Sequence, residues 1–222
     1  MMHTSPEEIS KRISEACRGP WLRGYVKSKL RTDPLYEAVV AELIDSAEPL
    51  LDIGCGIGLL GSYLRLKGWE GKVTGVDFDP RKIKQGQKMR DKLGLTGIDL
   101  KHGLAEEVTQ GFNGNVAILD VLQYLDAAGQ EKLLNELLPQ VSLNGKIIIR
   151  SGLYDDSRRF RMTQLGDWFG KLTFWMKESP VHYPSEEFLK KAFTANGLTC
   201  QISPLWGNTP FNNYLIVGTR KR

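Results

Sequence analysis

Three glycines set one residue apart, followed by an acid on the next expected strand, form the clearest signal of a binding site in this chain. Gly54, Gly56 and Gly58 follow the apolar run Leu50–Ile53, which predicts a short buried strand that enters a tight turn. Such a turn lets the backbone pass close beneath a ligand and leads into a helix whose N-terminus faces it. Asp77 ends the next expected strand, where a carboxylate can accept hydrogen bonds from two ribose hydroxyls. The pattern predicts a site for a nucleotide-type cofactor.

The same glycines fit the fingerprint of dinucleotide-binding enzymes, because Gly56–Gly61 reads GxGxxG. Asp52 argues against a dinucleotide, since its carboxylate would face a pyrophosphate, but it suits a ligand that carries an ammonium and a sulfonium. The strand also begins near residue 48, behind a long N-terminal extension, whereas dinucleotide fingerprints usually open their domain. An NAD-linked oxidoreductase is therefore the less favoured alternative.

Four linked segments resemble, in family order, the motifs of the class I S-adenosylmethionine-dependent methyltransferases. They are Leu51–Gly58, similar to motif I; Val76–Pro80, similar to the motif that follows it; Asn115–Leu125, similar to the fourth strand and its exit; and Leu143–Arg150, similar to the turn and fifth strand. The resemblance covers roughly residues 48 to 220. It implies an enzyme whose cofactor is S-adenosyl-L-methionine, and the alternative in this class is a non-catalytic protein that binds the same cofactor.

The resemblance also implies which residues surround the cofactor. Asp77 would bind the ribose diol and Asp52 would lie near the methionyl ammonium. The N-terminal arm often folds over the cofactor in this family, so Arg23, Lys29 or Arg31 would hold its carboxylate, and spacing does not choose among them. The expected cofactor-binding residues are Asp52, Gly54, Cys55, Gly56, Gly58, Asp77, Phe78, Ala105, Asp120 and Arg31.

One position departs from the family pattern. Leu104 stands where many relatives carry an acid that is hydrogen-bonded to the adenine amine. The backbone N–H of Ala105 is then expected to serve the adenine ring, with Glu106 or Gln123 reaching the amine.

The expected acceptor side is rich in aromatic residues. Asp120–Gln123 lacks both prolines of the tetrapeptide that methyltransferases acting on base amines carry at this place, so methylation of nucleic acid bases is disfavoured. The insertion 152–184 holds seven of the twenty aromatic residues of the chain: Tyr154, Phe160, Trp168, Phe169, Phe174, Trp175 and Tyr183. Aromatic side chains build flat walls that exclude water. Although most of these rings would pack a helix from Ser157 to about Phe169, we expect a lid over an aromatic or long unsaturated acceptor.

Charged residues of the insertion allow two interpretations. Arg158, Arg159 and Arg161 form either a solvated helix face or an anchor for a carboxylate or phosphate, including a phosphopantetheine arm.

The stretches Lys29–Tyr36 and His182–Ser185 resemble methyltransferases of bacterial aryl-polyene and fatty-acid-type pathways. The expected acceptor is accordingly a small molecule, aromatic or phenolic, or an acyl chain on a carrier protein, methylated at oxygen or carbon.

The expected catalytic residues are His182 and Tyr183. His182 follows the aromatic segment and precedes Ser185, which can cap the last helix. This places the imidazole at the rim of the sheet where ligands of doubly wound folds bind, and it can take up a phenolic proton near neutral pH. No metal is expected, because Asp120 and the pair Asp155–Asp156 only weakly resemble the metal-binding acids of the magnesium-dependent catechol methyltransferases.

Periodicity predicts an α/β, doubly wound, Rossmann-like fold with a seven-stranded, mostly parallel sheet and an antiparallel last strand. Strands are expected near 49–53, 72–77, 97–102, 115–119, 145–150, 198–203 and 213–219, and N-terminal helices open at Ser5–Pro6 and run from Leu35 to about Ser46. One domain, 1–222, is expected to comprise an N-terminal helical arm (1–47), a cofactor-binding half (48–151), a lid insertion (152–184) and a last helix with a strand hairpin (185–222).

Composition is that of an ordinary soluble globule, with 41% apolar and 25% charged residues. The net charge is +4, and the charges are scattered except for two basic clusters, Arg23–Arg31 and Arg158–Arg161, so a nucleic acid partner is not favoured. Cys17, Cys55 and Cys200 match neither a metal site nor a disulfide framework. The first ten residues contain no apolar targeting segment and no long apolar run follows, so a cytoplasmic protein without a membrane partner is expected. The sequence does not indicate the oligomeric state.

Overall fold

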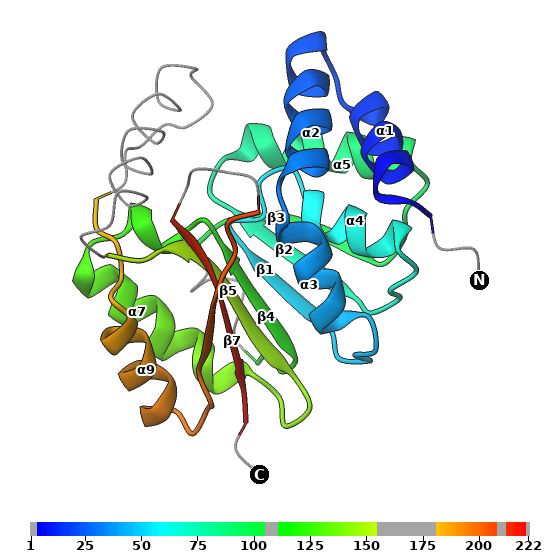
Figure 1. The fold of residues 1–222 in the computed structure, drawn as a ribbon. Coiled ribbons are helices and arrows are strands. Elements are labelled where there is room, and N and C mark those ends of the chain that lie inside the picture. The colour runs from blue at the N-terminus through cyan, green and yellow to red at the C-terminus, as the bar shows by residue number, and fades with distance from the viewer. Residues whose placement is uncertain (1–3, 105–110, 155–180, 208–211, 221–222) are drawn as a thin grey trace. The chain divides into compact units, whose positions relative to one another are not determined.

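The computed structural model describes residues 4–104, 111–154, 181–207 and 212–220. The chain forms two compact units, Met1–Asn115 and Val116–Arg222, and each is described by itself. Figure 1 shows the elements of both.

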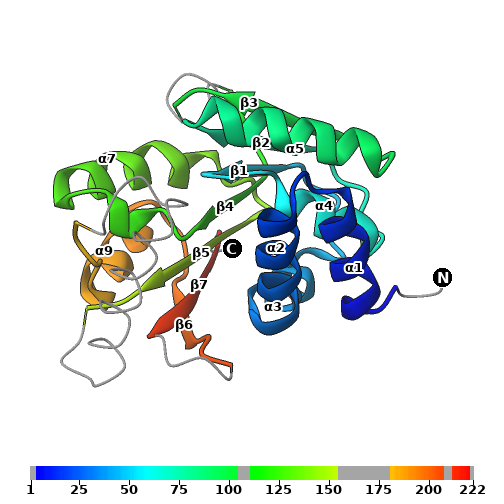
Figure 2. The ribbon, with the colours of Figure 1, turned by 90° about the horizontal axis from the view of Figure 1, so that it is seen from above.

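The first unit contains three parallel strands in the order β3-β2-β1. Its elements are α1 (Pro6–Ala16), α2 (Pro20–Thr32), α3 (Leu35–Leu43), β1 (Leu50–Ile53), α4 (Leu59–Leu66), β2 (Val73–Asp77), α5 (Pro80–Lys92) and β3 (Ile98–His102). The pairing joins Leu50 to Val73 and Asp77 to His102. Helix α5 packs against β2 and β3 (Figure 2).

Helix α1 begins at the capping signal that the sequence offers. The Ser5 hydroxyl accepts a hydrogen bond from the Glu8 amide, with Pro6 in the first turn, as expected. Helix α3 ends at Leu43 rather than near Ser46, and the Ser46 hydroxyl lies in the connection to β1. It accepts hydrogen bonds from the Glu48 amide at 3.3 Å and from Asn115 Nδ2 at 2.9 Å.

The second unit has the strand order β4-β5-β7-β6. Its elements are β4 (Asn115–Leu119, whose first residue belongs to the first unit), η1 (Leu122–Tyr124), α7 (Ala127–Leu137), η2 (Leu138–Gln140), β5 (Lys146–Gly152), α9 (Glu186–Ala195), β6 (Gln201–Pro204) and β7 (Asn213–Thr219). Strand β4 pairs with β5 in parallel, and β7 runs antiparallel to both β5 and β6.

The expected fold class is confirmed: seven strands, mostly parallel with an antiparallel β7, are accompanied by helices. Strand β6 begins at Gln201 rather than at 198, since Leu198 makes only an isolated bridge to Arg220. Ser185 caps α9 as expected, with its hydroxyl accepting from the Phe188 amide. Of the helices described, none is long and apolar enough to cross a membrane.

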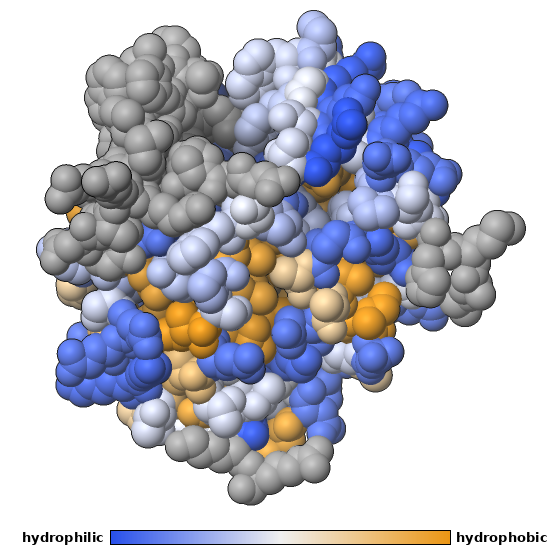
Figure 3. Space-filling model, in the orientation of Figure 1, coloured by the Kyte–Doolittle hydropathy of each residue, from blue (hydrophilic) through white to orange (hydrophobic). Residues whose placement is uncertain are grey.

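Hydrophilic side chains cover much of the N-terminal helices in the view of Figure 3. Within α2, Leu22, Val26 and Leu30 are buried at helical spacing, so this helix packs through one apolar stripe. Helix α2 lies within the N-terminal helical arm expected at 1–47, where the individual helices expected were those that open at Ser5–Pro6 and at Leu35.

Candidate functional site

The glycine turn after β1 has the backbone conformation that the sequence predicts. Gly54, Gly56 and Gly58 have φ of 71°, 59° and 72°, in the left-handed region that residues with a Cβ rarely adopt. At Gly58, the residue that caps α4, an added Cβ would also lie 3.0 Å from the Leu100 side chain. Glycine is therefore favoured here by its backbone conformation, and the Leu100 side chain would have to shift slightly to admit a Cβ.

Hydrogen bonds hold this turn against the end of β2. The amides of Gly54 and Cys55 both donate to the Val76 carbonyl, at 2.8 and 3.0 Å, and the Gly58 amide donates to the Cys55 carbonyl at 2.9 Å. The Gly56 amide donates to Asp77 Oδ2 at 2.9 Å. Since these four amides have partners within the unit, the turn offers a shaped floor to a ligand rather than a row of free donors.

Asp77 is the acceptor at the end of β2. Its side chain is buried, with Oδ2 accepting from Gly56 and Oδ1 accepting from the Asp79 amide at 2.8 Å. A carboxylate has about four lone-pair sites, so Asp77 retains capacity for two hydroxyl donors. The two backbone bonds fix its orientation, which suits recognition of a ribose diol.

Asp52 lies inside β1 with only 3% of its surface exposed. Burial, and then the nearby charge of Asp77, raise the pKa of its carboxyl to about 8. A carboxylate in this setting is costly unless a cation neutralises it. The electrostatics therefore fit a positively charged group, such as the ammonium that the sequence analysis expects here.

Cys55 contributes shape rather than reactivity. Burial, followed by the charges of Asp52 and Asp77, raises the pKa of its thiol far above the ordinary value. A Cβ on Gly75 would lie 2.9 Å from Cys55 Sγ, so the thiol packs against β2. A further residue that the sequence analysis missed is Gly86, where a Cβ would lie 2.6 Å from the Ile57 carbonyl oxygen. It allows α5 to approach the turn closely.

Two exposed apolar side chains stand at the ends of neighbouring strands beside Asp77. Phe78 is 50% exposed after β2, and Leu104 is 56% exposed beyond β3. His102 Nε2 lies 3.2 Å from the Phe78 carbonyl oxygen, and the Gly103 amide donates to the Asp77 carbonyl. Exposed apolar groups at such an edge suit contact with a flat ring. Leu104, which departs from the family pattern, thus offers an apolar wall in place of an acid.

The three basic candidates of the N-terminal arm are in different environments. Arg23 donates to the Cys17 carbonyl at 2.9 Å, and Lys29 pairs with Asp33 at 3.3 Å. Arg31 is exposed on α2, where it lines a cavity of about 320 Å³ with Lys27. Among the residues described, neither Arg23 nor Arg31 has an acidic partner, and the expected contact of Arg31 with the cofactor carboxylate stays a prediction. Ala105 and Glu106 lie outside the described residues.

In the second unit, Asp120 follows β4 with a φ of 58°, unusual for a residue other than glycine. Its carboxylate forms a two-point ion pair with Arg150 of β5, with Nε 2.6 Å from Oδ1 and Nη2 bonded to Oδ2. Its amide also donates to the Arg150 carbonyl at 3.0 Å. The expected cofactor contact of Asp120 stays a prediction, and Arg150 is the partner that the sequence analysis missed. An arginine that ends the apolar run Ile147–Ile149 was the available signal.

The two expected catalytic residues lie beside the segment that follows β4. The Gln123 carbonyl accepts from the amides of Val181 and His182, at 2.7 and 3.3 Å. Buried Gln130 donates from Nε2 to the His182 carbonyl at 2.9 Å and to the Leu122 carbonyl at 2.9 Å. The His182 side chain itself is exposed.

Tyr183 and the end of β5 complete this region. A Cβ on Gly152 would lie 3.0 Å from the Tyr183 ring, so the ring covers that glycine. The Tyr154 amide donates to the Pro184 carbonyl at 3.1 Å, and Ser151 Oγ lies 3.5 Å from Gln123 Oε1. Polar groups from β5, η1 and the segment before α9 are thereby brought together.

Most of the insertion lies outside the described residues, including its expected helix, the three arginines, Asp155–Asp156 and the aromatic residues from Phe160 to Trp175. Within the described part of the chain, no group of three or more His, Cys, Asp or Glu side chains is arranged to hold a metal ion.

Comparison with known proteins gives a family match over more than half of the chain. A family model described as a methyltransferase domain matches residues 44–179. The ribosomal RNA small subunit methyltransferase G of Leuconostoc mesenteroides is 30% identical over 124 residues, which is 54% of this chain and 50% of the relative. The chain thus spans about half the length of this curated relative.

Solved structures agree on the fold. The magnesium protoporphyrin IX methyltransferase from Synechocystis PCC 6803, with bound SAH, superposes with a TM-score of 0.67 at 15% identity, covering 99% of this chain and 96% of that one. An O-methyltransferase family protein from Burkholderia thailandensis gives a TM-score of 0.65 at 15% identity, with 91% and 60% coverage.

Proposed function

The chain belongs to the class I S-adenosylmethionine-dependent methyltransferases, and we propose that it methylates a small-molecule acceptor. The acceptor is an aromatic or phenolic compound, or an acyl chain on a carrier protein, and it is methylated at oxygen or carbon. The family match supports the enzyme and its cofactor. The choice of acceptor depends on the second unit.

The choice of a small-molecule acceptor depends on how the two ends of the insertion 152–184 are held by hydrogen bonds. Its last residues bond to Gln123, since Val181 and His182 both donate to that carbonyl. Near its start, the Tyr154 amide donates to the carbonyl of Pro184 at the other end of the insertion. Both ends are therefore tied at the carboxyl ends of β4 and β5, the edge where doubly wound folds bind ligands. The sequence between these ends is rich in aromatic residues, which favours a flat apolar acceptor over a polyanion.

The first unit fits the cofactor through chemistry already described. Asp77 would hold the ribose hydroxyls, Asp52 the ammonium, and Phe78 with Leu104 the adenine ring. S-adenosylmethionine, when bound, supplies an electrophilic methyl group to a nucleophile placed in line with its carbon–sulfur bond. Holding the two reactants in that geometry replaces a bimolecular encounter, which is a large part of the rate enhancement.

His182 is the residue we assign to proton removal. The Gln123 carbonyl accepts from the His182 amide and the Gln130 side-chain amide donates to the His182 carbonyl, so the main chain is held on both sides of the exposed imidazole. A neutral imidazole nitrogen can act as a general base, so it can accept the proton of a phenolic hydroxyl and release it to solvent. Tyr183, which covers Gly152, would orient the acceptor beside it.

A second candidate, a ribosomal RNA acceptor, is favoured by one observation: the curated relative is named for that substrate. The test compares acceptors directly. We would incubate the protein with S-adenosylmethionine labelled in its methyl group and three acceptors: free phenolic compounds, the same groups loaded on a carrier protein, and ribosomal RNA with small subunits. We expect label in the first or second acceptor. Label in RNA alone would overturn the proposal, and cofactor binding with no transfer to any acceptor would support a non-catalytic protein.

The role of His182 is tested by the pH dependence of the rate. With a phenolic acceptor, His182→Ala should lose the acidic limb of the pH–rate profile, and Tyr183→Phe should keep it. If His182→Ala retains both turnover and the wild-type limb, His182 is not the base.

A further inference from the structure

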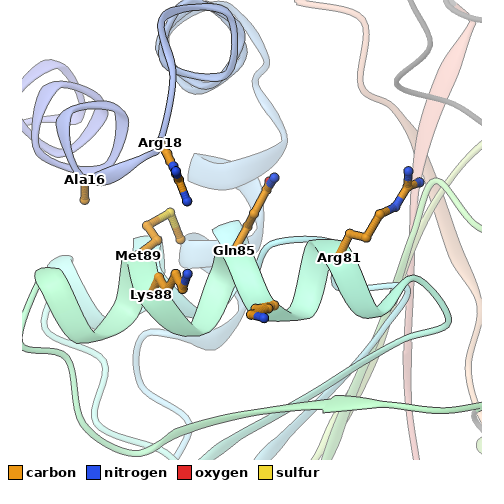
Figure 4. A pocket seen from close by; sticks show the side chains of 7 residues that line it. Ala16, Arg18, Arg81, Gln85, Lys88 and Met89 are labelled. Carbon is orange, nitrogen blue, oxygen red and sulfur yellow. The ribbon is translucent and has the colours of Figure 1, made fainter.

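A basic pocket lies between α5 and the end of α1. It has a volume of about 380 Å³ and is formed by the end of α1, the turn that follows it, and one face of α5. We call this cavity the basic pocket. It is lined by Ala16, Arg18, Arg81, Lys84, Gln85, Lys88 and Met89. Figure 4 shows Arg18 directed toward Met89 and Lys88 on α5, with Arg81 farther along the helix.

The positive charge of this pocket is largely uncompensated. Helix α5 carries six lysines and arginines and one acid, although the whole chain has a net charge of only +4. Arg81 pairs with Asp79 at 2.8 Å, whereas Arg18, Lys84 and Lys88 have no acidic partner among the described residues. Lys84 and Lys88 are four residues apart on one helix face, where like charges repel. An acidic ligand from outside the unit would relieve that repulsion.

The floor of the pocket is apolar. The Met89 side chain is buried and its sulfur lies 3.6 Å from Cys17 Sγ, while Ala16 forms the opposite wall. None of the seven lining residues is aromatic, so the pocket has no platform on which a nucleic acid base would stack. Cations around a small apolar floor instead match an acidic helix that presents one apolar side chain.

We infer that the basic pocket docks an acidic helix of a partner protein. Carboxylates of that helix meet Arg18, Lys84 and Lys88, and one apolar side chain enters between Ala16 and Met89. The inference deepens the proposed function and rests on it in one respect: a carrier protein that presents the acceptor is the partner this surface fits. The contact adds no chemistry, and it raises the local concentration of the acceptor near the enzyme.

The test uses the full-length protein and a purified acidic acyl carrier protein as the probe. Fluorescence anisotropy of the labelled carrier gives the dissociation constant at low and moderate salt. Lys84→Glu/Lys88→Glu should weaken binding on the order of tenfold or more, because two attractions become repulsions. Ala16→Phe should also weaken it by filling the cavity without changing the charge. A matched control, Lys11→Glu/Lys191→Glu, reverses two exposed lysines outside the pocket and should bind as the wild type does.

The outcomes are separable from those of the proposed function, because binding is measured without methyl transfer. Equal binding by the wild type and the pocket variant would overturn the inference, as would equal losses in the pocket variant and the control. A pocket variant that loses affinity for a duplex RNA probe but not for the carrier would identify a phosphodiester site and also overturn it. Titration with S-adenosylhomocysteine confirms that each variant keeps a folded cofactor site.

Discussion

Replacing the buried acid of β1 gives the sharpest prediction, because Asp52 affects stability and cofactor binding in opposite directions. Its pKa of about 8 arises from burial and from Asp77, so at pH 7 about nine molecules in ten carry the neutral carboxyl. Pairing with an ammonium requires the ionised form. Below pH 8, affinity for S-adenosylhomocysteine should therefore fall by up to about tenfold per pH unit, and it should level off above pH 8.

Asp52→Asn removes this dependence. Losing a charged hydrogen-bond acceptor costs about 1.5–3 kcal/mol, so at pH 8.5 the variant should bind roughly ten- to a hundredfold more weakly. At pH 6.5 the wild type must first ionise the carboxyl at a cost of about 2 kcal/mol, and the two proteins should bind almost equally. Isothermal titration calorimetry over this range measures both affinities. A cofactor analogue without the amino group provides the control, since its binding should not follow pH in this way.

The sign for stability is opposite. Between the ordinary value of 3.8 and about 8, the folded protein holds a proton that the unfolded chain has released. The Asp52 contribution to the free energy of unfolding is therefore fully present below pH 3.8 and is lost as pH rises toward 8, by at most about 1.4 kcal/mol per pH unit. In urea unfolding without ligand, the free energy of unfolding of Asp52→Asn should fall less than that of the wild type as the pH rises from 3.8 to about 8. Parallel stability curves, or affinities that differ equally at both pH values, would show that Asp52 does not titrate with a raised pKa in the folded protein.

Three other predictions follow from the same geometry. Asp77→Ala should weaken S-adenosylhomocysteine binding by about 1.5–3 kcal/mol, measured by calorimetry, and unchanged affinity would remove Asp77 from the site. Arg150→Met should lower the free energy of unfolding by about 2–4 kcal/mol, because it leaves the Asp120 carboxylate without its two-point partner; an unchanged urea midpoint would show that the pair is dispensable. Activity should survive EDTA, and its loss with recovery on adding magnesium would reveal a metal site.

Local signals in the sequence predicted much of the fold and part of the site. The left-handed turn at Gly54–Gly58 was predictable because glycine alone reaches those angles without strain. The starts of α1 and α9 were predictable because Ser5 and Ser185 satisfy free amides at the helix ends. These features depend on residues within a few positions of one another.

The contacts that were missed join segments far apart in the chain. Arg150 of β5 pairs with Asp120 at the end of the neighbouring strand β4, and Gln130 of α7 donates to the His182 carbonyl. Gly86 is needed because a backbone from another segment passes close to it. No local pattern encodes such pairings, since they exist only after the strands have taken their order. Helix α2 is a different case from these long-range contacts. Its apolar stripe of Leu22, Val26 and Leu30 is a local pattern, but lysines and arginines stand between these residues and make the stripe hard to recognise.

The measurement that tests the cofactor site most directly is a structure of the protein with bound S-adenosylhomocysteine. Both ribose hydroxyls should lie within hydrogen-bond distance of Asp77, and the ammonium should lie beside Asp52. The adenine should contact Phe78 and Leu104. A nucleoside bound elsewhere, with Asp77 retaining only its bonds to Gly56 and Asp79, would show that the glycine turn and Asp77 do not form the cofactor site.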